Sequence, residues 1–384
     1  MALTALRPTG NRIQAPARYA ATLPTPSGYR AAWLDSGTSA LALAIFAAKA
    51  RASCRPNQEV ILPAYGCPDL VAAAQYAGVR AVLVDIQPDS PLYDYPLLQA
   101  AISPNTIAIV AATLLGIRPN EAKLREIIGD RPIALIEDSA QWFPRDNSQT
   151  FFGDSVVVSF GRGKPVNLLG GGALFTRDEL PAEVLTHVQN IAEGNFAQIK
   201  HELRRLTYNT LIQPAVYNAI ERAPFLHIGV TTFHALQNIH AMTPSIKRLL
   251  DSNLQQYASQ DLRIQQQWRV ALGSLPPGIM IDLCQAHDIA EDIALLRYPI
   301  LIKNPLRRDA IYARLRDEGL GASTMYGQPL IGIEHVDSHA RLFADDKNAA
   351  DFSARLLTLP THKAVSSQTI AQTIDIIRDC ISND

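Results

Sequence analysis

The stretch that decides the fold is Ser155-Val-Val-Val-Ser-Phe-Gly-Arg-Gly-Lys164-Pro-Val-Asn-Leu-Leu-Gly170-Gly-Gly-Ala-Leu-Phe-Thr176. An apolar strand here ends in a short loop that carries one lysine, and a glycine triplet then leads into a second apolar strand. Upstream, the apolar strand Ile133-Ala-Leu-Ile-Glu-Asp138 ends in a carboxylate and continues to Gln141. These features predict that a lysine and an aspartate lie at the ends of neighbouring strands.

Such a pair suits the chemistry of pyridoxal phosphate (PLP). The lysine forms a Schiff base with the cofactor aldehyde, and the aspartate pairs with the pyridinium nitrogen. Asp138 could instead cap a helix or bind a surface arginine, and Lys164 could be a solvated loop residue. A P-loop is excluded, because Val158 stands where its first glycine belongs and Pro165 replaces the hydroxyl residue that holds magnesium.

Helices and strands alternate between about residue 38 and residue 180. The helices are expected at 38–50, 69–76, 95–102 and 120–128, and the strands before Asp138 at 59–63, 81–86 and 107–113. The strands are almost continuous apolar runs, as in a parallel sheet covered by helices on both faces. The pattern predicts an α/β fold with a large, doubly wound, mostly parallel sheet, whose ligands lie at the carboxyl ends of the strands.

The remaining sequence predicts an arm and a smaller C-terminal α/β domain. Residues 179–275 are expected to be mostly helical, with breaks near Pro224 and Pro244, and the smaller domain is expected to contain strands at 295–302 and 356–360 and helices at 305–318 and 367–381. We therefore predict an N-terminal arm (1–30), a large PLP-binding domain (31–245) and a small C-terminal domain (246–384).

Composition excludes several other classes of protein. The 384 residues carry a net charge of −1, which gives no global electrostatic case for binding nucleic acid or an acidic membrane surface. No run of about 18 apolar residues is present, and no leader sequence is evident. The four cysteines form no CxxC pair, and His335 and His339 lack the glutamate of an HExxH motif. We expect a cytoplasmic protein without a bound metal.

Three further positions have a functional and a simpler interpretation. The turn Ser36-Gly37-Thr38-Ser39 opens an Ala/Leu-rich helix, so its backbone N–H groups could hold a phosphate, although an ordinary helix cap would look the same. Ser159 could bind the cofactor phosphate or be a polar strand end. Gln141 could contact the phenolic oxygen of the cofactor or only the backbone.

In their order and separation, these motifs resemble the sugar aminotransferases of the DegT/DnrJ/StrS type, which are PLP enzymes of fold type I. The resemblance runs from about residue 34 to the C-terminus. It is carried by Ser36-Gly-Thr-Ser-Ala-Leu41, Glu59-Val-Ile-Leu-Pro63, Val84-Asp-Ile86, Ile136-Glu-Asp-Ser-Ala-Gln141, Ser159-Phe160 with Lys164, and Gly170-Gly-Gly-Ala173.

The resemblance implies a role for each of these residues. Lys164 is the Schiff-base lysine and general base, Asp138 binds the pyridinium, and Gln141 contacts the phenolic oxygen. The implied residues around the cofactor phosphate are Gly37, Thr38, Ser39 and Ser159. The resemblance also implies a homodimer with active sites at the interface. The expected reaction moves an amino group from an amino acid, usually glutamate, to a keto sugar that is usually nucleotide-linked, in amino-sugar biosynthesis such as that of polysaccharides.

Two alternatives keep the scaffold and change the function. One is a PLP-dependent dehydratase or other PLP chemistry; dehydratase relatives tend to have histidine in place of the lysine, so Lys164 disfavours this branch. The other is a non-catalytic regulatory homologue, which the complete set of cofactor residues disfavours.

The chain also departs from the family pattern in three segments. The aromatic residue that stacks on the cofactor ring falls in Pro63-Ala-Tyr65-Gly-Cys67, where either Tyr65 or Cys67 could take its place. The lysine loop reads Gly161-Arg-Gly-Lys-Pro165 instead of a Tyr-Pro-Thr-Lys-Asn pattern. The segment expected to contact the partner's phosphate, Asn238-Ile-His-Ala-Met242, aligns poorly.

Overall fold

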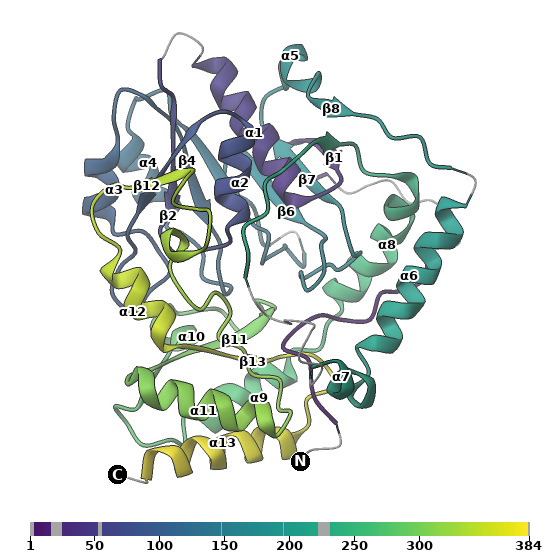
Figure 1. Ribbon diagram of the computed structural model, residues 1–384, viewed down its shortest axis with the longest axis vertical. Helices are drawn as coiled ribbons and strands as arrows, with labels where there is room; N and C mark the ends of the chain where they lie inside the picture. The colour runs from purple at the N-terminus through teal and green to yellow at the C-terminus, as the bar shows by residue number, and fades with distance from the viewer. Residues whose placement is uncertain are drawn as a thin grey trace.

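An eight-stranded sheet forms the centre of the protein, in the order β1-β7-β6-β5-β4-β2-β3-β12 (Figure 1). We analysed a computed structural model that describes residues 4–16, 25–52, 56–146, 148–194, 196–221 and 231–382. The strands are β1 (Arg30–Leu34), β2 (Glu59–Pro63), β3 (Arg80–Val84), β4 (Thr106–Ala112), β5 (Ala134–Asp138), β6 (Ser155–Ser159), β7 (Gly172–Thr176) and β12 (Ala340–Leu342). Strand β7 is antiparallel to both of its neighbours, and all other pairs are parallel.

Helices cover both faces of this sheet, as the apolar strands predict. Val60 of β2 belongs to the buried cluster that includes α1 (Gly37–Arg51) and α2 (Asp69–Tyr76). The next residue, Ile61, belongs to the cluster on the opposite face, with α3 (Tyr95–Ala101) and α4 (Glu121–Ile128). Successive side chains of a strand point to opposite faces, so a two-sided core requires apolar residues at every position.

Side-chain caps begin several of these helices. Ser36 caps α1 by accepting a hydrogen bond from Ser39 N. Asp94 accepts from Leu97 N at the start of α3, and Asn120 accepts from Lys123 N at the start of α4. Each cap satisfies a backbone N–H that the first helical turn leaves without a partner.

The smaller domain has an antiparallel sheet in the order β10-β11-β13. Its strands are β10 (Met280–Asp282), β11 (Arg297–Ile302) and β13 (Leu356–Pro360), and its helices are α9 (Arg263–Leu272), α10 (Leu283–Ala286), α11 (Pro305–Asp317), α12 (Lys347–Arg355) and α13 (Ser367–Ser382). The expected strands and helices of this region are confirmed, whereas β10 and β12 lie outside every predicted element.

The region between the two sheets differs from the sequence expectation. Its helices are α5 (Ala182–Leu185), α6 (Ala197–Leu211), α7 (Pro214–Glu221) and α8 (Pro244–Ala258), with a small parallel pair, β8 (Val188–Gln189) and β9 (Ile239–His240). The prediction of mostly helical structure over 179–275 is therefore wrong for residues 188–194 and 231–243, although α8 does begin at Pro244. The break expected near Pro224 lies outside the described residues.

Helix α8 joins the core of the large sheet. Its residues Leu249, Leu250 and Tyr257 belong to the same buried cluster as Val156 and Val158 of β6. It covers the β6–β7 end of the sheet on the face opposite α1. The domain limit near residue 245 stays a prediction.

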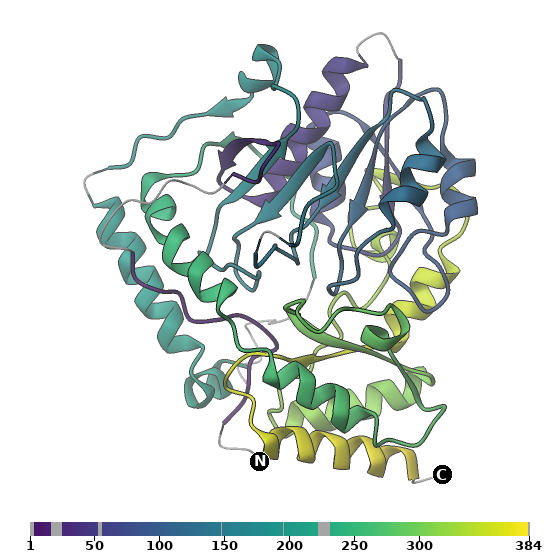
Figure 2. The ribbon, with the colours of Figure 1, turned by 180° about the vertical axis from the view of Figure 1, so that it is seen from behind.

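The first described residues cross the molecule in an extended path, and we call residues 4–16 the N-terminal strap. Leu6 N donates to Gly319 O (2.7 Å) in the smaller domain, and Ile13 N donates to Asn209 Oδ1 (2.9 Å) on α6. Figure 2 shows the strap, in purple, running from the smaller domain to α6. None of the described helices combines the length and the apolarity that crossing a bilayer requires.

Candidate active site

The predicted site residues gather at the carboxyl edge of the large sheet. Asp138 ends β5, Ser159 ends β6, and the turn before α1 follows β1. Beside this edge is a cavity of about 610 Å³ whose wall includes both Gln141 and Lys164. The other lining residues are Arg7, Pro8, Thr9, Arg162, Gly163, Tyr208, Leu211, Ile212, Tyr217, Ile220, Thr231, Leu296, Arg297, Ser323, Met325 and Tyr326.

Asp138 and Lys164 lie close enough to influence each other. Burial raises the pKa of Asp138, while a hydrogen bond from Ala140 N (3.0 Å) and the charge of Lys164 act in the opposite direction. The Lys164 ammonium forms no hydrogen bond or ion pair with the residues that the structure describes. A carboxylate in this setting favours a positively charged partner, and the lysine amine has no competing contact among the described side chains.

Gln141 holds two walls of the cavity together. Its side-chain oxygen accepts a hydrogen bond from Leu115 N (3.3 Å), and its amide donates to the Tyr326 hydroxyl (3.4 Å). Gln141 therefore contacts the backbone, as its simpler interpretation expects, and its amide also contacts Tyr326 in the cavity wall.

The turn before α1 is packed tightly against β6. A Cβ added at Gly37 would lie 2.7 Å from Ser159 Cβ, which is too close for any side chain. Ser39 is fully buried, and its N–H is already held by the Ser36 cap (3.0 Å). The Thr38 hydroxyl donates to Asp69 Oδ2 (3.0 Å). Gly37 and Ser159 therefore lie in contact, while the Thr38 and Ser39 side chains have partners within the protein.

The two candidates for ring stacking have different surroundings. Tyr65 is fully buried between Tyr326 and Phe352, and its hydroxyl donates to Tyr326 O (3.0 Å). Cys67 is only partly buried, its thiol is hydrogen-bonded to the Tyr326 hydroxyl, and the charge of Lys164 acts on it. Burial raises the pKa of Cys67 to about 12, so the thiol is neutral at pH 7. Of the two residues, Cys67 is the one with a surface near Lys164.

The glycine triplet makes room for the turn before α1. A Cβ at Gly172 would lie 2.4 Å from Ser36 O, and Gly171 has a φ of +93° and would clash with Met242 Cε at 2.9 Å. A Cβ added at Gly170 would meet no atom closer than 3.5 Å. Two of the three glycines are therefore required by close contacts around the site.

The segment Asn238–Met242 packs within its own subunit. His240 O accepts a hydrogen bond from Asp35 N (2.9 Å), and its ring Nδ1 lies 3.2 Å from Asp35 Oδ2. Met242 N donates to Trp33 O (2.9 Å). These contacts hold β9 beside β1 and the turn before α1.

Sequence reasoning missed the residues that come from the smaller domain and the strap. Arg297 begins β11, and Ser323, Met325 and Tyr326 follow α11 in a segment without regular structure. No periodic pattern marks that segment. Met325 has a φ of +56°, which is rare for a side chain of its size, but this conformation is a property of the fold and is not visible in the sequence.

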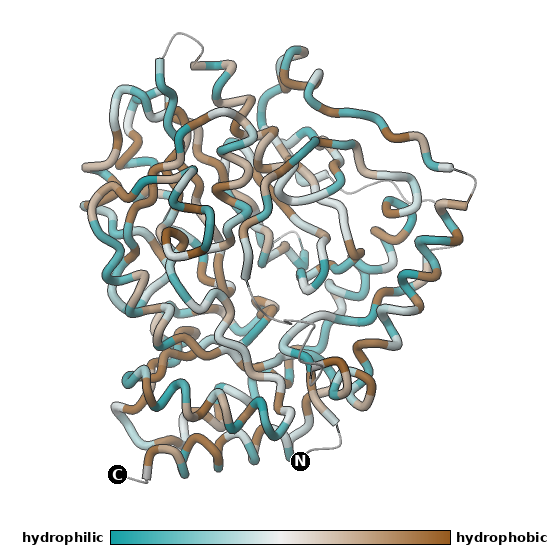
Figure 3. Tube along the Cα trace, in the orientation of Figure 1, coloured by the Kyte–Doolittle hydropathy of each residue, from teal (hydrophilic) through white to brown (hydrophobic). Residues whose placement is uncertain are grey.

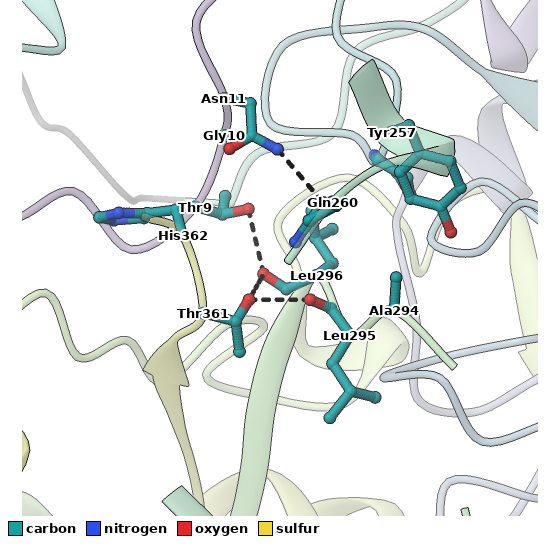
Figure 4. Close-up of a pocket in the computed structure, with 11 residues that line it drawn as sticks. Thr9, Gly10, Asn11, Tyr257, Gln260, Ala294, Leu295, Leu296, Thr361 and His362 are labelled. Carbon is teal, nitrogen blue, oxygen red and sulfur yellow. Dashed lines mark hydrogen bonds between the residues drawn. The ribbon is translucent and has the colours of Figure 1, made fainter. Parts of the chain in front are cut away.

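A second, much smaller space lies behind the lysine loop (Figure 4). It measures about 20 Å³ and is lined by Pro165 and by strap residues. Figure 4 shows Thr9 donating to Leu296 O (3.4 Å) and Asn11 donating to Gln260 Oε1 (3.4 Å). It is a packing gap where the strap attaches, too small for a substrate. Among the described residues, no cluster of three or more His, Cys, Asp or Glu could hold a metal ion.

The sequence profile of the DegT/DnrJ/EryC1/StrS aminotransferase family matches residues 28–378. The chain belongs to this family. The resemblance drawn from the motifs is therefore confirmed, and so is the prediction of an aminotransferase-family enzyme.

Two curated relatives are nucleotide-sugar aminotransferases. The UDP-2-acetamido-2-deoxy-3-oxo-D-glucuronate aminotransferase of Pseudomonas aeruginosa is 31% identical over 153 residues, which are 39% of this chain and 42% of that relative. That match thus spans less than half of the relative's length. The dTDP-3-amino-3,4,6-trideoxy-alpha-D-glucose transaminase of Micromonospora megalomicea is 25% identical over 358 residues, covering 91% of this chain and 84% of the relative.

A solved structure of similar fold is the E. coli GDP-4-keto-6-deoxy-D-mannose-3-dehydratase with bound hydrated PLP. It matches with a TM-score of 0.67 and 19% identity, over 91% of this chain and 88% of that chain. This likeness confirms the predicted fold type I architecture, with its large mostly parallel sheet and smaller C-terminal sheet.

Proposed function

We propose that this protein is a PLP-dependent aminotransferase that moves an amino group from an amino acid, in the first instance glutamate, to a keto sugar that is linked to a nucleotide. The observation that carries the proposal is that Asp138 and Lys164 interact beside a cavity of substrate size. A family assignment alone leaves the reaction open, because a family can include several chemistries on one fold.

The residues present fit PLP in two independent ways. The buried Asp138 carboxylate is suited to a protonated ring nitrogen, because a positive partner offsets the cost of burial. The close contact between Gly37 and Ser159 places both residues at the start of α1, where the positive end of a helix favours a phosphate. When bound, PLP supplies an electron sink that acidifies the carbon bearing the amino group.

Lys164 would carry the proton transfers. Its amine extends from a loop into the cavity wall, so it can take a proton from a substrate carbon and return it at another position. Asp138 keeps a fixed negative charge at the end of β5 throughout these steps. Gln141 and Cys67 are proposed to contact the cofactor oxygen and the ring face.

The proposed substrates follow from the relatives. The two relatives described above are named for nucleotide-linked sugars, and the cavity of about 610 Å³ lies within the usual size range of small-molecule sites. Glutamate is the donor that the resemblance implies.

We also propose a homodimer with active sites at its interface. The exposed face of α6 supports self-association: Phe196, Ile199, Leu203 and Leu206 are between 50% and 76% exposed. Their spacing of three or four residues places them on one side of the helix. Figure 3 shows brown, apolar segments recurring along α6 at the edge of the molecule. A stripe of this size is unusual on a surface that stays in water.

An absorption spectrum of the purified protein tests the proposed reaction. The PLP-loaded protein is expected to show the visible band of a cofactor linked to lysine, and glutamate is expected to convert it to the amine form. Lys164→Ala is expected to lose the lysine-linked band. The matched control is Lys303→Ala, which removes an exposed lysine of the smaller domain and should leave both spectra unchanged.

Each other outcome points to a different function. A lysine-linked band that no amino acid converts would move the assignment to a dehydratase or other PLP reaction on the sugar, the chemistry named for the structurally similar E. coli enzyme. A protein that shows no band after PLP is added would contradict the proposal and favour a regulatory role.

A further inference from the structure

The cavity wall is strongly cationic. Lys164, Arg162, Arg7 and Arg297 all line it, and no aspartate or glutamate is among its described lining residues. Lys164 and the exposed Arg162 come from the lysine loop. Arg7 and Arg297 come from the strap and from β11, and the reaction proposed above does not use them.

Among the described residues, Arg297 has no acidic partner. It donates one hydrogen bond, to Ser323 Oγ (2.9 Å), and the other polar groups that act on it are tyrosine hydroxyls. Within the described residues no salt bridge joins it to a carboxylate. Burial lowers its pKa, which means that the charged form is poorly solvated where it stands. Buried guanidinium groups are normally paired with an anion.

Arg7, on another part of the cavity wall, also has no acidic partner among the described residues. It is only 6% exposed, and its guanidinium donates to two backbone carbonyls, Gly10 O (2.6 Å) and Ile212 O (3.1 Å). Burial lowers its pKa too, and Tyr208 and Tyr217 are the groups that favour its charge. Two carbonyls use only part of the five N–H donors of a guanidinium, so donors remain for a ligand.

The strap and β11 are attached to each other at this point. Thr9 donates to Leu296 O (3.4 Å), next to Arg297, and His362 is hydrogen-bonded to Arg7 O (2.8 Å). His362 Nδ1 accepts from Ala364 N (3.3 Å), so the ring donates from Nε2. The two arginines are therefore held by packed backbone and not by long flexible loops.

We propose that Arg7 and Arg297 form the cationic side of the substrate cavity and bind anionic groups of the substrate, a carboxylate or a phosphate; this subsite is separate from the turn at Gly37, which does not line the cavity. A planar guanidinium fits either group with two parallel hydrogen bonds. The subsite rests on the proposed function for its biological substrate, and on the cavity geometry alone for its existence. The carboxylate would come from the amino donor, and the phosphate from a nucleotide-linked acceptor.

Calorimetric titration of the PLP-loaded full-length protein with glutarate, and separately with pyrophosphate, tests the subsite. Glutarate has the two carboxylates of glutamate but no amine, so its binding does not depend on turnover. At least one anion is expected to bind, and the one that binds identifies the source. Arg297→Gln and Arg7→Gln are each expected to weaken that binding about tenfold or more, because each removes charge-assisted hydrogen bonds.

Three variants make the result specific. Arg162→Gln removes an exposed arginine of the same cavity and should change affinity less than threefold at 0.15 M salt, since exposed charges are screened. Arg297→Lys keeps the charge and should recover part of the lost affinity. Asn209→Ala loosens the strap without removing a charge, and it should bind the anion more tightly than Arg7→Gln.

Two results would overturn the subsite. The first is that neither glutarate nor pyrophosphate binds. The second is that Arg7→Gln and Arg297→Gln bind the anion as tightly as the wild type does, with melting temperatures within a few degrees of the wild-type value. If Arg162→Gln weakens anion binding as much as the other two glutamine variants do, the affinity comes from the overall positive charge of the cavity and not from Arg7 and Arg297, which would also overturn the subsite. If the protein never takes up PLP, the same titrations are made on the protein as isolated, so failure of the proposed reaction and failure of the subsite are read separately.

Discussion

Asp138 places a cost on the cofactor-free protein that PLP binding is expected to remove. Burial raises its pKa, so the folded state binds a proton more tightly than the unfolded chain does. The contribution of this group to stability is therefore fully present below the ordinary aspartate pKa and is lost as pH rises through the folded-state value. The deprotonated carboxylate opposes folding.

Asp138→Asn is accordingly expected to raise the melting temperature of the cofactor-free protein at pH 7, with a gain that shrinks toward pH 4. The asparagine oxygen can still accept from Ala140 N. The same variant is expected to weaken PLP affinity at least tenfold, because the pyridinium loses its anion. Melting curves between pH 4 and 8 and a PLP titration measure both effects; a variant that is less stable at pH 7 would contradict the argument.

The glycine triplet allows a matched test of close packing. Gly172→Ala would force a methyl group to 2.4 Å from Ser36 O, so the turn before α1 must move away from β7. We expect a loss of about 2–4 kcal/mol in unfolding free energy and weaker PLP binding. Gly170→Ala, with an open approach and an ordinary φ, is the control and should stay within about 1 kcal/mol. Urea unfolding of both variants measures their unfolding free energies and compares them with that of the wild type.

The candidate site residues that the sequence alone could identify are those at the ends of strands. Asp138 and Lys164 stand at or near strand ends, and the carboxyl ends of parallel strands share one edge, so their proximity followed from topology. The difference between Tyr65 and Cys67 could not be read, because it depends on which residue Phe352 of α12 covers. That contact joins segments far apart in the chain.

Among the elements, α12 is capped by a carboxylate that directly follows β3 of the large sheet. Asp85, in the Val84-Asp-Ile86 motif, accepts from Asn348 N and Ala349 N (both 2.9 Å) and so caps α12 from outside the helix. Asp346, the residue in the cap position, makes no side-chain cap hydrogen bond. The carboxylate of this motif therefore links the large sheet to a helix of the smaller domain.

Asp85→Ala is expected to destabilise the protein by about 1–3 kcal/mol, because it leaves buried N–H groups without an acceptor. Asp346→Ala, the control, should change stability by less than about 0.5 kcal/mol. Equilibrium unfolding compares the two. Equal effects would mean that the nominal cap, and not Asp85, holds the helix.

Most of the longer strands and helices could be predicted, but β1, α12 and the three-residue strands β10 and β12 could not. Strand β12, Ala340-Arg-Leu342, has too few residues for a pattern, and it exists because the exposed edge of β3 offers hydrogen-bonding groups to a passing segment. Capping by Asp85 was hidden for a similar reason, since its partners lie more than 260 residues away.

For the whole molecule, the apolar stripe on α6 predicts association in solution. Leu203→Glu places a charge in the middle of this stripe and is expected to shift the protein from dimer to monomer in sedimentation velocity. Val270→Glu, at a 77% exposed residue of α9 away from the stripe, is the control and should leave the sedimentation coefficient unchanged. A wild-type monomer at micromolar concentration would contradict the proposed homodimer.

At this scale the sequence predicted the architecture and not the wall of the cavity. Arg7, Arg297 and Tyr326 come from the strap, β11 and the segment after α11, three parts of the chain that only the fold brings together. The extended strap has no periodicity to reveal it. Its position depends on Gly319 and Gly321, where an added Cβ would lie within about 3 Å of strap atoms.

The strap also sets an order for biosynthesis. Residues 4–16 are made before the residues that they contact: Leu6 binds Gly319, and Arg7 binds His362, 355 positions later. Most of the large sheet can form while synthesis continues, but the cavity wall closes only after the segments that contain Gly319 and His362 have been made. A nascent or truncated chain that ends before residue 319 would therefore expose an open cavity and an unattached N-terminus, which are the features that chaperones and proteases recognise.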